Sequence, residues 1–362
     1  MSDKFFKDSV NNLRPYKISD FDIWSENRDY LKLDWNESTI PPSPKVISAI
    51  KKLIDESSLN WYPPLFNKLL LELLADYNNV GIMNVQYFAG SDSFQEYLIQ
   101  ACIEPNDIVT IISPTYDNFR VVVESYGGII ENYNLGNNFS LNEESLYNFI
   151  EDKNPKVAYI CNPNNPTGTV YTFEFCETII RDFQDTLFIF DEAYFEFSGI
   201  TVSSLVNNYS NFIISRTFSK AFGLASFRIG YAIGPKEIID TINKVRNPKN
   251  IALISQVAAI ESLKDIDYMH SFTFEVDNSK SLLEDFLVNQ GLHFNSRKGN
   301  YIMIKAENFE KSDMINFLHK RDILVRDLGH LDQLSNFFRI TIGTVEQTKT
   351  VIKNLDRFLN NQ

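Results

Sequence analysis

The chain has 362 residues, of which 44% are hydrophobic and 14% aromatic, enough for one large and one smaller domain. Its 34 basic and 47 acidic residues give a formal net charge of −13, which argues against nucleic acid or an anionic membrane as the main partner. The first residues lack the apolar stretch of a signal peptide, and no apolar run is long enough to span a bilayer. The three cysteines, Cys102, Cys161 and Cys176, have no metal-ligand spacing. We therefore expect a cytoplasmic protein with reduced core thiols and no metal site.

The first part of the chain predicts an arm followed by helices. Residues 1–40 are too short and too broken by proline to form a domain, so we expect an N-terminal arm that belongs with the smaller domain. Apolar residues then recur at helical spacing over 45–56 and 69–74. A Gly-Ser-Asp turn at 90–92 opens a helix over about 94–102. Such a helix start presents free N–H groups to a phosphate, although Ser and Asp are also ordinary N-caps.

From this helix onward the pattern alternates between strand and helix. Continuous apolar runs at 108–112, 157–161, 187–190 and 212–214 are typical of a parallel sheet that is covered on both faces. Polar residues follow each run, and α/β sheets bind ligands at the carboxyl ends of their strands. The recurrence predicts one composite site in a large domain over residues 41–246.

The last part, residues 247–362, predicts a smaller α+β domain. We expect a long helical region and then short strands, at 251–274, 279–289, 301–304, 323–326 and 337–343. The predicted fold class is α/β, with a large, mostly parallel sheet sandwiched by helices and a smaller α+β domain.

The segment around Lys220 has the most distinctive chemistry. Lys220 lies among Ser, Thr, Phe and Gly, with Arg216 and Leu224 where an exposed helical lysine usually has acidic neighbours. An amine near aromatics and another cation has a depressed pKa, which suits Schiff-base chemistry with an aldehyde. Hydroxyls and an arginine nearby fit a phosphate, and aldehyde plus phosphate points to pyridoxal phosphate. Taken alone, Lys220 is better explained as a surface lysine, so the other motifs decide.

Three motifs occur in order at successive strand ends: Asn-Pro-Asn-Asn-Pro-Thr-Gly at 162–168, Asp-Glu-Ala-Tyr at 191–194 and Thr-Phe-Ser-Lys-Ala-Phe-Gly-Leu-Ala at 217–225. Together with the Gly-Ser-Asp turn they resemble a fold-type-I pyridoxal-phosphate aminotransferase of class I and II, in the histidinol-phosphate aminotransferase-like branch. The resemblance covers nearly the whole chain. It implies aminotransferase fold type I, pyridoxal 5′-phosphate (PLP) as cofactor, transaminase activity and a homodimer with shared active sites.

The resemblance also implies roles for individual residues. Lys220 would form the Schiff base with the cofactor and move the proton between the substrate Cα and the cofactor C4′. Asp191 would bond the pyridine nitrogen and keep the ring protonated, so that the ring accepts electrons. Tyr194 and Asn165 would bond the ring 3′-oxygen, and Tyr116 would stack on the ring. Donors to the cofactor phosphate would come from Ser91, Asp92, Thr217, Ser219 and Arg228, and from Tyr62 of the partner subunit.

Substrate residues follow from the same resemblance. Arg339 matches the arginine that grips the α-carboxylate, and Tyr16, Asn36 and Arg326 match positions that contact the substrate in the histidinol-phosphate branch. Asn36-Glu37-Ser38-Thr39-Ile40-Pro41-Pro42 replaces the usual Asn-Glu-Asn-Pro-x-Gly-Pro, and Ser93 replaces an acidic residue. These departures leave the chemistry intact but favour a substrate other than histidinol phosphate. We expect an amino-acid donor, glutamate, and a small carbonyl acceptor that is phosphorylated or serves a surface polysaccharide.

Alternatives remain open at this stage. Asp191 could also be an ordinary helix N-cap, Tyr116 could be a turn residue after a proline, and Arg339 could be a charged residue on an edge strand. A PLP-dependent decarboxylase of a phospho-amino acid such as threonine phosphate shares the motif set, because both reactions start from the same complex of substrate and cofactor. A non-catalytic regulator would need a DNA-binding domain and a basic surface, whereas this chain is acidic and has about forty residues before the large domain.

Overall fold

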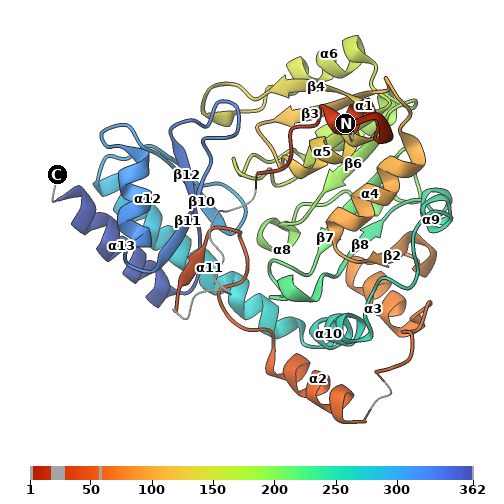
Figure 1. The fold of residues 1–362 in the computed structure, drawn as a ribbon, viewed down its shortest axis with the longest axis horizontal. Coiled ribbons are helices and arrows are strands. Elements are labelled where there is room, and N and C mark those ends of the chain that lie inside the picture. The colour runs from red at the N-terminus through yellow and green to blue at the C-terminus, as the bar shows by residue number, and fades with distance from the viewer. Residues whose placement is uncertain (1–2, 18–28, 57–58, 361–362) are drawn as a thin grey trace.

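The computed structural model describes residues 3–17, 29–56 and 59–360, and in that part the strands form two sheets (Figure 1). The larger sheet has seven strands in the order β2-β8-β7-β6-β5-β3-β4. In this order they are Val85–Phe88, Gly230–Ile233, Phe212–Thr217, Leu187–Asp191, Val157–Cys161, Ile108–Ser113 and Ile129–Asn134. The strands from β7 to β4 run parallel, whereas β8 is antiparallel to both of its neighbours.

The smaller sheet has the order β1-β11-β12-β10-β9. These strands are Leu31–Leu33, Ile323–Asp327, Phe337–Thr341, Tyr301–Lys305 and Phe294–Asn295. The first of them, β1, pairs in parallel with β11, so the N-terminal segment contributes a strand to a sheet that is otherwise built from the last third of the chain. After β1 the chain passes into the space between the two sheets, which places residues 34–37 beside the site described below.

Helices α1 to α10 lie on the side of the larger sheet, and the last three lie with the smaller one (Figure 1). The first group comprises α1 (Asp8–Asn11), α2 (Pro44–Glu56), α3 (Lys68–Asn78), α4 (Ser91–Cys102), α5 (Asn118–Ser125), α6 (Glu143–Lys153), α7 (Phe173–Asp182), α8 (Phe195–Ser198), α9 (Lys236–Asn243) and α10 (Leu253–Lys264). The second comprises α11 (Ile266–Asn289), α12 (Lys311–His319) and α13 (Val345–Leu359). None of the helices in the described ranges has the length and apolar character needed to cross a membrane.

The central strands are buried because helices cover both faces of the larger sheet. Every residue of β5 and β7 is buried. Successive side chains of β6 enter different cores: Phe188 and Phe190 join one cluster, whereas Ile189 joins the other. This two-sided burial explains why the strands have continuous apolar runs instead of alternation. The predicted α/β class and the parallel strands are confirmed.

Some local differences from the expectations have physical reasons. Residues 275–278 continue α11, and the helical region breaks instead at Asp265, where the backbone leaves the helical range at φ −122° and ψ 47°. The edge strands β2 and β4 were not predicted. β4 mixes exposed and partly buried residues because it lies at the margin of the sheet, and β2 is short and carries a polar Gln86.

A buried ion pair lies behind the sheet ends. The guanidinium of Arg216 contacts Glu192 Oε2 from Nε at 2.9 Å and from Nη2 at 2.7 Å, and each side chain is only 1% exposed. Asn78 and Thr201 accept further hydrogen bonds from Arg216, and its guanidinium lies 3.5 Å from the centre of the Phe195 ring. Through Asn78 of α3 and Phe195 of α8, the ion pair links the ends of β6 and β7 to two neighbouring helices.

Replacing Glu192 by glutamine should therefore destabilise the protein by about 3–5 kcal/mol, because it leaves the Arg216 charge buried without a counter-charge. Denaturant unfolding followed by circular dichroism measures this change. The matched control is Glu346→Gln, which removes the partner of Lys349 from an exposed pair and should cost no more than about 1 kcal/mol. Equal midpoints for the two variants would contradict the assignment.

Candidate active site

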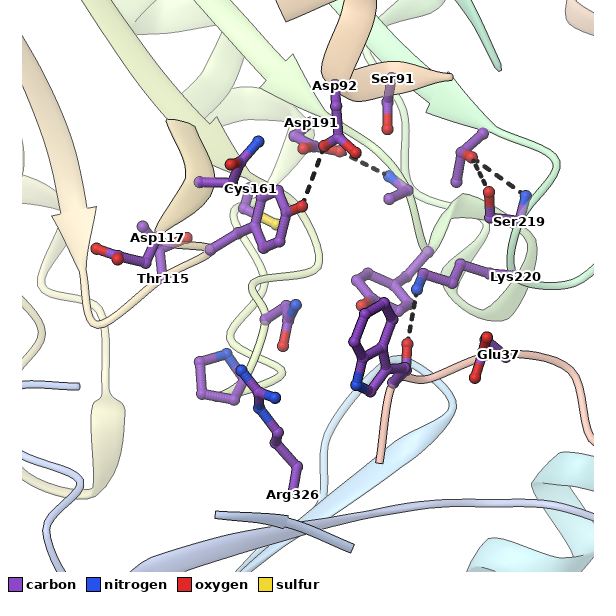
Figure 2. A pocket seen from close by; sticks show the side chains of 18 of the residues that line it. Glu37, Ser91, Asp92, Thr115, Asp117, Cys161, Asp191, Ser219, Lys220 and Arg326 are labelled. Atoms are coloured by element: carbon purple, nitrogen blue, oxygen red, sulfur yellow. Dashed lines mark hydrogen bonds between the residues drawn. The ribbon is translucent and has the colours of Figure 1, made fainter. Parts of the chain in front are cut away.

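A cavity of about 520 Å³ lies at the carboxyl ends of the parallel strands, between the two sheets. Thirteen of the predicted site residues line it: Tyr16, Ser91, Asp92, Tyr116, Asn165, Asp191, Tyr194, Thr217, Ser219, Lys220, Arg228, Arg326 and Arg339. Figure 2 shows Ser91, Asp92 and Asp191 at one end of this cavity, Arg326 at the other, and Lys220 between them. The composite site predicted from the strand ends is thus present as one cavity.

One end of the cavity is rich in hydrogen-bond donors. Helix α4 begins at Ser91 without a side-chain cap, so its first backbone N–H groups stay available to a ligand. The hydroxyls of Thr217 and Ser219 lie 3.0 Å apart, at the end of β7. A Cβ added at Gly230 would lie 2.8 Å from the backbone nitrogen of Ser91, so only glycine lets β8 approach the start of α4 this closely.

Arg228 completes this end of the cavity. It has a left-handed backbone at φ 46°, directly after the short turn 225–227. Its Nη2 contacts Asp92 Oδ2 at 3.3 Å, and the Tyr116 hydroxyl donates to the other oxygen of Asp92 at 3.0 Å. Tyr16 packs edge-on against the Tyr116 ring, with 5.9 Å between the ring centres. Asp92 thus fixes both a cation and an aromatic ring beside the helix start.

Asp191 closes the wall of the cavity at the end of β6. It is 4% exposed and accepts hydrogen bonds from Tyr159, Gln95 and the backbone N–H of Ala193. Burial raises its pKa to about 6, and these three donors oppose the shift because they favour the ionised form. The site therefore holds a carboxylate that is buried and ionised at neutral pH.

Lys220 presents its amine to the middle of the cavity. Nζ donates to the backbone oxygen of Trp35 at 2.9 Å and lies 6.0 Å from the centre of the Tyr194 ring (Figure 2). Burial, and then the positive charge of Arg339, lower the pKa of Lys220 to about 8. A substantial fraction of the amine is therefore neutral near pH 8, as a nucleophile requires.

This depressed pKa predicts how the protein takes up an aldehyde. Below the pKa the amine is protonated and does not attack a carbonyl, so the rate of covalent PLP uptake by the apoprotein should rise with pH and level off above about 8. Stopped-flow absorbance measures this rate. Pyridoxamine phosphate, which has no aldehyde, should bind without that pH dependence. A midpoint near the ordinary value of 10.5 would contradict the depressed pKa.

Arg339 and its neighbours form another wall of the cavity, on the side of the smaller sheet. Arg339 donates from Nη1 to Asn165 Oδ1 and from Nη2 to the backbone oxygen of Asp34, both at 2.6 Å. Its buried Nε has no partner among the described residues. Since a guanidinium has five N–H donors, these two hydrogen bonds leave three donors of Arg339 unused. Asn36 lies behind this wall and donates to the Tyr194 hydroxyl at 2.9 Å.

Arg326 lies directly opposite Arg339 in the register of β11 and β12, so the two side chains are neighbours on one face of the smaller sheet. Its Nη2 donates to the backbone oxygen of Lys17 at 2.6 Å. The pKa of Tyr16 is raised by burial although both arginines act to lower it. Two guanidinium groups thus face the same cavity, one deep and one near its far end.

A family model described as aminotransferase class I and II matches residues 28–355. The chain belongs to this aminotransferase family. A dihydroxyacetone phosphate transaminase of Campylobacter jejuni is 41% identical over 360 residues, covering 98% of this chain and 97% of the relative. A histidinol-phosphate aminotransferase of a Thermoanaerobacter species is 32% identical over 329 residues, covering 91% and 93%.

The solved histidinol-phosphate aminotransferase of Sinorhizobium meliloti, in complex with pyridoxal-5′-phosphate, has the same fold, with a TM-score of 0.88 and 23% identity over 98% of each chain. The protein is therefore a PLP-dependent transaminase of fold type I, as the motifs predicted. The cavity of this aminotransferase fits the cofactor. One end offers N–H, hydroxyl and guanidinium donors suited to a phosphate, the middle offers an amine of depressed pKa, and the wall offers an ionised carboxylate.

Two predicted residues of this aminotransferase do not line the cavity. Asn36 is buried behind it, where it contacts Tyr194. Tyr62 lies outside the cavity and is 79% exposed, with Lys249 over its ring. Several lining residues were not predicted, among them Trp35, which accepts from Lys220, and His330, whose pKa is lowered by burial and by Arg326.

Proposed function

We propose that this transaminase moves the amino group of L-glutamate to a small phosphorylated ketone, and that this ketone is dihydroxyacetone phosphate. The pair Arg326 and Arg339 carries the proposal, because two cations at different depths suit a ligand with anionic groups at two places. Glutamate has two carboxylates, and dihydroxyacetone phosphate has a phosphate at one end of a short chain. The similarity to the Campylobacter jejuni dihydroxyacetone phosphate transaminase supports the choice of ketone.

The direct test supplies the holoenzyme with L-glutamate and dihydroxyacetone phosphate. We expect 2-oxoglutarate and the amino alcohol phosphate that carries the new amino group on the former carbonyl carbon, both identified by mass spectrometry. The decarboxylase alternative is tested by incubating the holoenzyme with threonine phosphate, from which we expect no release of CO₂. Faster turnover of histidinol phosphate with 2-oxoglutarate than of the proposed pair would refute the assignment of the ketone.

The two arginines should affect the two half-reactions differently. Arg339→Leu should lower kcat/KM for amino-acid donors by about 10–100-fold, because it removes charge-assisted bonds to the α-carboxylate. Its effect on dihydroxyacetone phosphate, which has no carboxylate, should be smaller. Arg326→Leu should lower kcat/KM for glutamate and for the phosphorylated ketone by a similar factor. It should leave kcat/KM for alanine unchanged, because alanine has no second anionic group. Single-turnover absorbance of each half-reaction measures the split, and equal losses with alanine and glutamate in Arg326→Leu would contradict it.

We also propose roles for the residues around the cofactor. When bound, PLP supplies an aldehyde that accepts the amino group and a ring that stabilises negative charge on the adjacent carbon. Lys220 Nζ would hold the aldehyde carbon in the resting enzyme and would move a proton to and from the substrate Cα. Asp191 would accept the pyridine N–H. Tyr194 would donate to the ring oxygen, since its hydroxyl oxygen already accepts from Asn36, and Asn165 would add a second contact there.

The cofactor phosphate, in this proposal, lies at the donor-rich end of the cavity. There it would accept hydrogen bonds from the start of α4 at Ser91 and Asp92, from Thr217 and Ser219, and from the guanidinium of Arg228. The Tyr116 ring beside Asp92 would cover one face of the pyridine. Tyr16 would join Arg326 at the substrate end.

We further propose a homodimer in the cytoplasm. Exposed apolar side chains are concentrated on α2, on the segment after it and at the start of α3, namely Ile47, Ile54, Leu59, Trp61, Tyr62, Leu65, Phe66 and Leu69. A second copy over this region would bury them and bring Tyr62 toward its partner's phosphate end. Light scattering measures the molar mass. The three unpaired cysteines fit a reducing compartment.

A further inference from the structure

Asp191 is held by side chains from two other elements. The Tyr159 hydroxyl, from β5, donates to Asp191 Oδ2 at 2.6 Å, and Gln95 Nε2, from α4, donates to the same oxygen at 2.8 Å. The backbone N–H of Ala193 donates to Oδ1 at 3.1 Å. Both Tyr159 and Gln95 are 0% exposed, so water does not compete for these bonds.

Counting acceptor positions shows what is left for a ligand. An ionised carboxylate has about four lone-pair positions, two on each oxygen. Among the described residues, Tyr159 and Gln95 fill both positions on Oδ2, and Ala193 fills one on Oδ1. The remaining acceptor position is on Oδ1, and Asp191 lines the cavity.

We propose that Gln95 and Tyr159 are positioning residues for the cofactor. By occupying Oδ2 they keep the Asp191 carboxylate ionised, fix its orientation and leave Oδ1 as the acceptor of the pyridine N–H. Their roles follow from the one proposed above for Asp191 and do not depend on the substrate.

The surroundings of the two donors support a directed role. The Tyr159 ring stacks on Phe119 with 4.1 Å between ring centres and 13° between planes, which fixes the direction of its hydroxyl. Gln95 gives an N–H to Asp191, but its own buried Oε1 has no partner among the described residues. An unpaired buried acceptor opposes folding, and a leucine of similar size would avoid it. Packing alone therefore does not account for a glutamine at this position.

The charge effect has a definite sign. Donors to a carboxylate favour its ionised form, so removing Tyr159 Oη or Gln95 Nε2 raises the pKa of Asp191 above its value of about 6. The other titratable groups that act on Asp191 are Asp92 on α4, and Tyr116, Cys161 and Tyr194 around the cavity. They stay unchanged in the experiment. A more basic carboxylate takes a larger share of the proton that lies between it and the ring nitrogen, so the nitrogen is protonated to a smaller extent before it titrates.

The experiment follows the ring nitrogen itself. Wild-type, Tyr159→Phe, Gln95→Leu and Asp191→Ala proteins are loaded with PLP labelled with ¹⁵N in the ring, and the nitrogen chemical shift is recorded against pH. Tyr171→Phe is the matched control, because Tyr171 is equally buried and its hydroxyl has no partner among the described residues. Circular dichroism verifies that each variant is folded. Each single variant keeps the other donor to Asp191, so the proposal can be tested even if only one of the two variants folds.

Below the pH at which the ring titrates, we expect the ring nitrogen to be less protonated in Tyr159→Phe and Gln95→Leu than in the wild type and Tyr171→Phe. Their kcat/KM should also fall, by about 10–100-fold for the loss of one hydrogen bond to a charged group. Wild-type profiles in both variants, with an early loss in Asp191→Ala, would overturn the roles of Gln95 and Tyr159 alone. A wild-type profile in Asp191→Ala would overturn the role of Asp191 as well.

Discussion

Replacing Lys220 by alanine is expected to lower transamination by at least roughly 10⁴-fold, the upper range for a positioned proton-transfer group. The loss would have two causes, because in the proposed mechanism the same amine holds the aldehyde carbon in the resting enzyme and moves the proton at the substrate Cα. The donors at the other end of the cavity remain, so the variant should still bind PLP, without the covalent link. Absorbance after borohydride treatment and gel filtration distinguishes covalent from non-covalent cofactor.

Lys280 provides the control for losing a buried lysine. Burial lowers its pKa to about 8, as for Lys220, but its amine bonds the backbone oxygens of Arg297 and Gly299 in the smaller domain region. Lys280→Met should therefore keep turnover in the folded protein. Added methylamine should restore part of the activity of Lys220→Ala, because it supplies a free amine to the vacant space. Ordinary turnover in Lys220→Ala without an amine would refute the role of this lysine.

The second large effect is expected at Asp191. Asp191→Ala should lower kcat by about 10²–10³-fold, the usual cost of removing one preorganised electrostatic group from an active site. The kcat of Asp191→Asn should fall by a similar factor, because this substitution keeps the size of the side chain and removes its charge. Steady-state kinetics with glutamate measures both variants. Near-normal activity in Asp191→Asn would show that shape, and not charge, is what the enzyme needs at this position.

The composite site could be predicted because each of its strands is a continuous apolar run that ends in polar residues. Asp191 and the lysine loop after β7 were found in this way, and the parallel pairing of β6 with β7 brings them together. The Gly-Ser-Asp turn was predicted to open a helix at about residue 94, and α4 begins three residues earlier, at Ser91, without a side-chain cap. The local sequence was sufficient here because the carboxyl ends of parallel strands lie at the same edge of the sheet, so residues that follow neighbouring strands are close in space.

Residues whose proposed role depends on a tertiary contact could not be found in the same way. Gln95 resembles any polar residue of a helix, and only its position four residues after Ser91 places both on one face of α4. Trp35 contributes a backbone oxygen, which no side-chain pattern reveals. The pairing of β1 with β11 joins residues almost 300 positions apart, and short-range periodicity has no access to such a contact.

The hydrogen bond from Lys220 to Trp35 joins two parts of the molecule that belong to different sheets. The lysine follows β7 of the larger sheet, whereas Trp35 follows β1 of the smaller sheet, only two residues after its last residue. Arg339, on the smaller sheet, likewise bonds Asn165 after β5 of the larger one. A rotation of one sheet against the other would stretch both bonds at once. The electrostatic surroundings of the amine, and with them its readiness to react, are therefore coupled to the angle between the two halves of the enzyme.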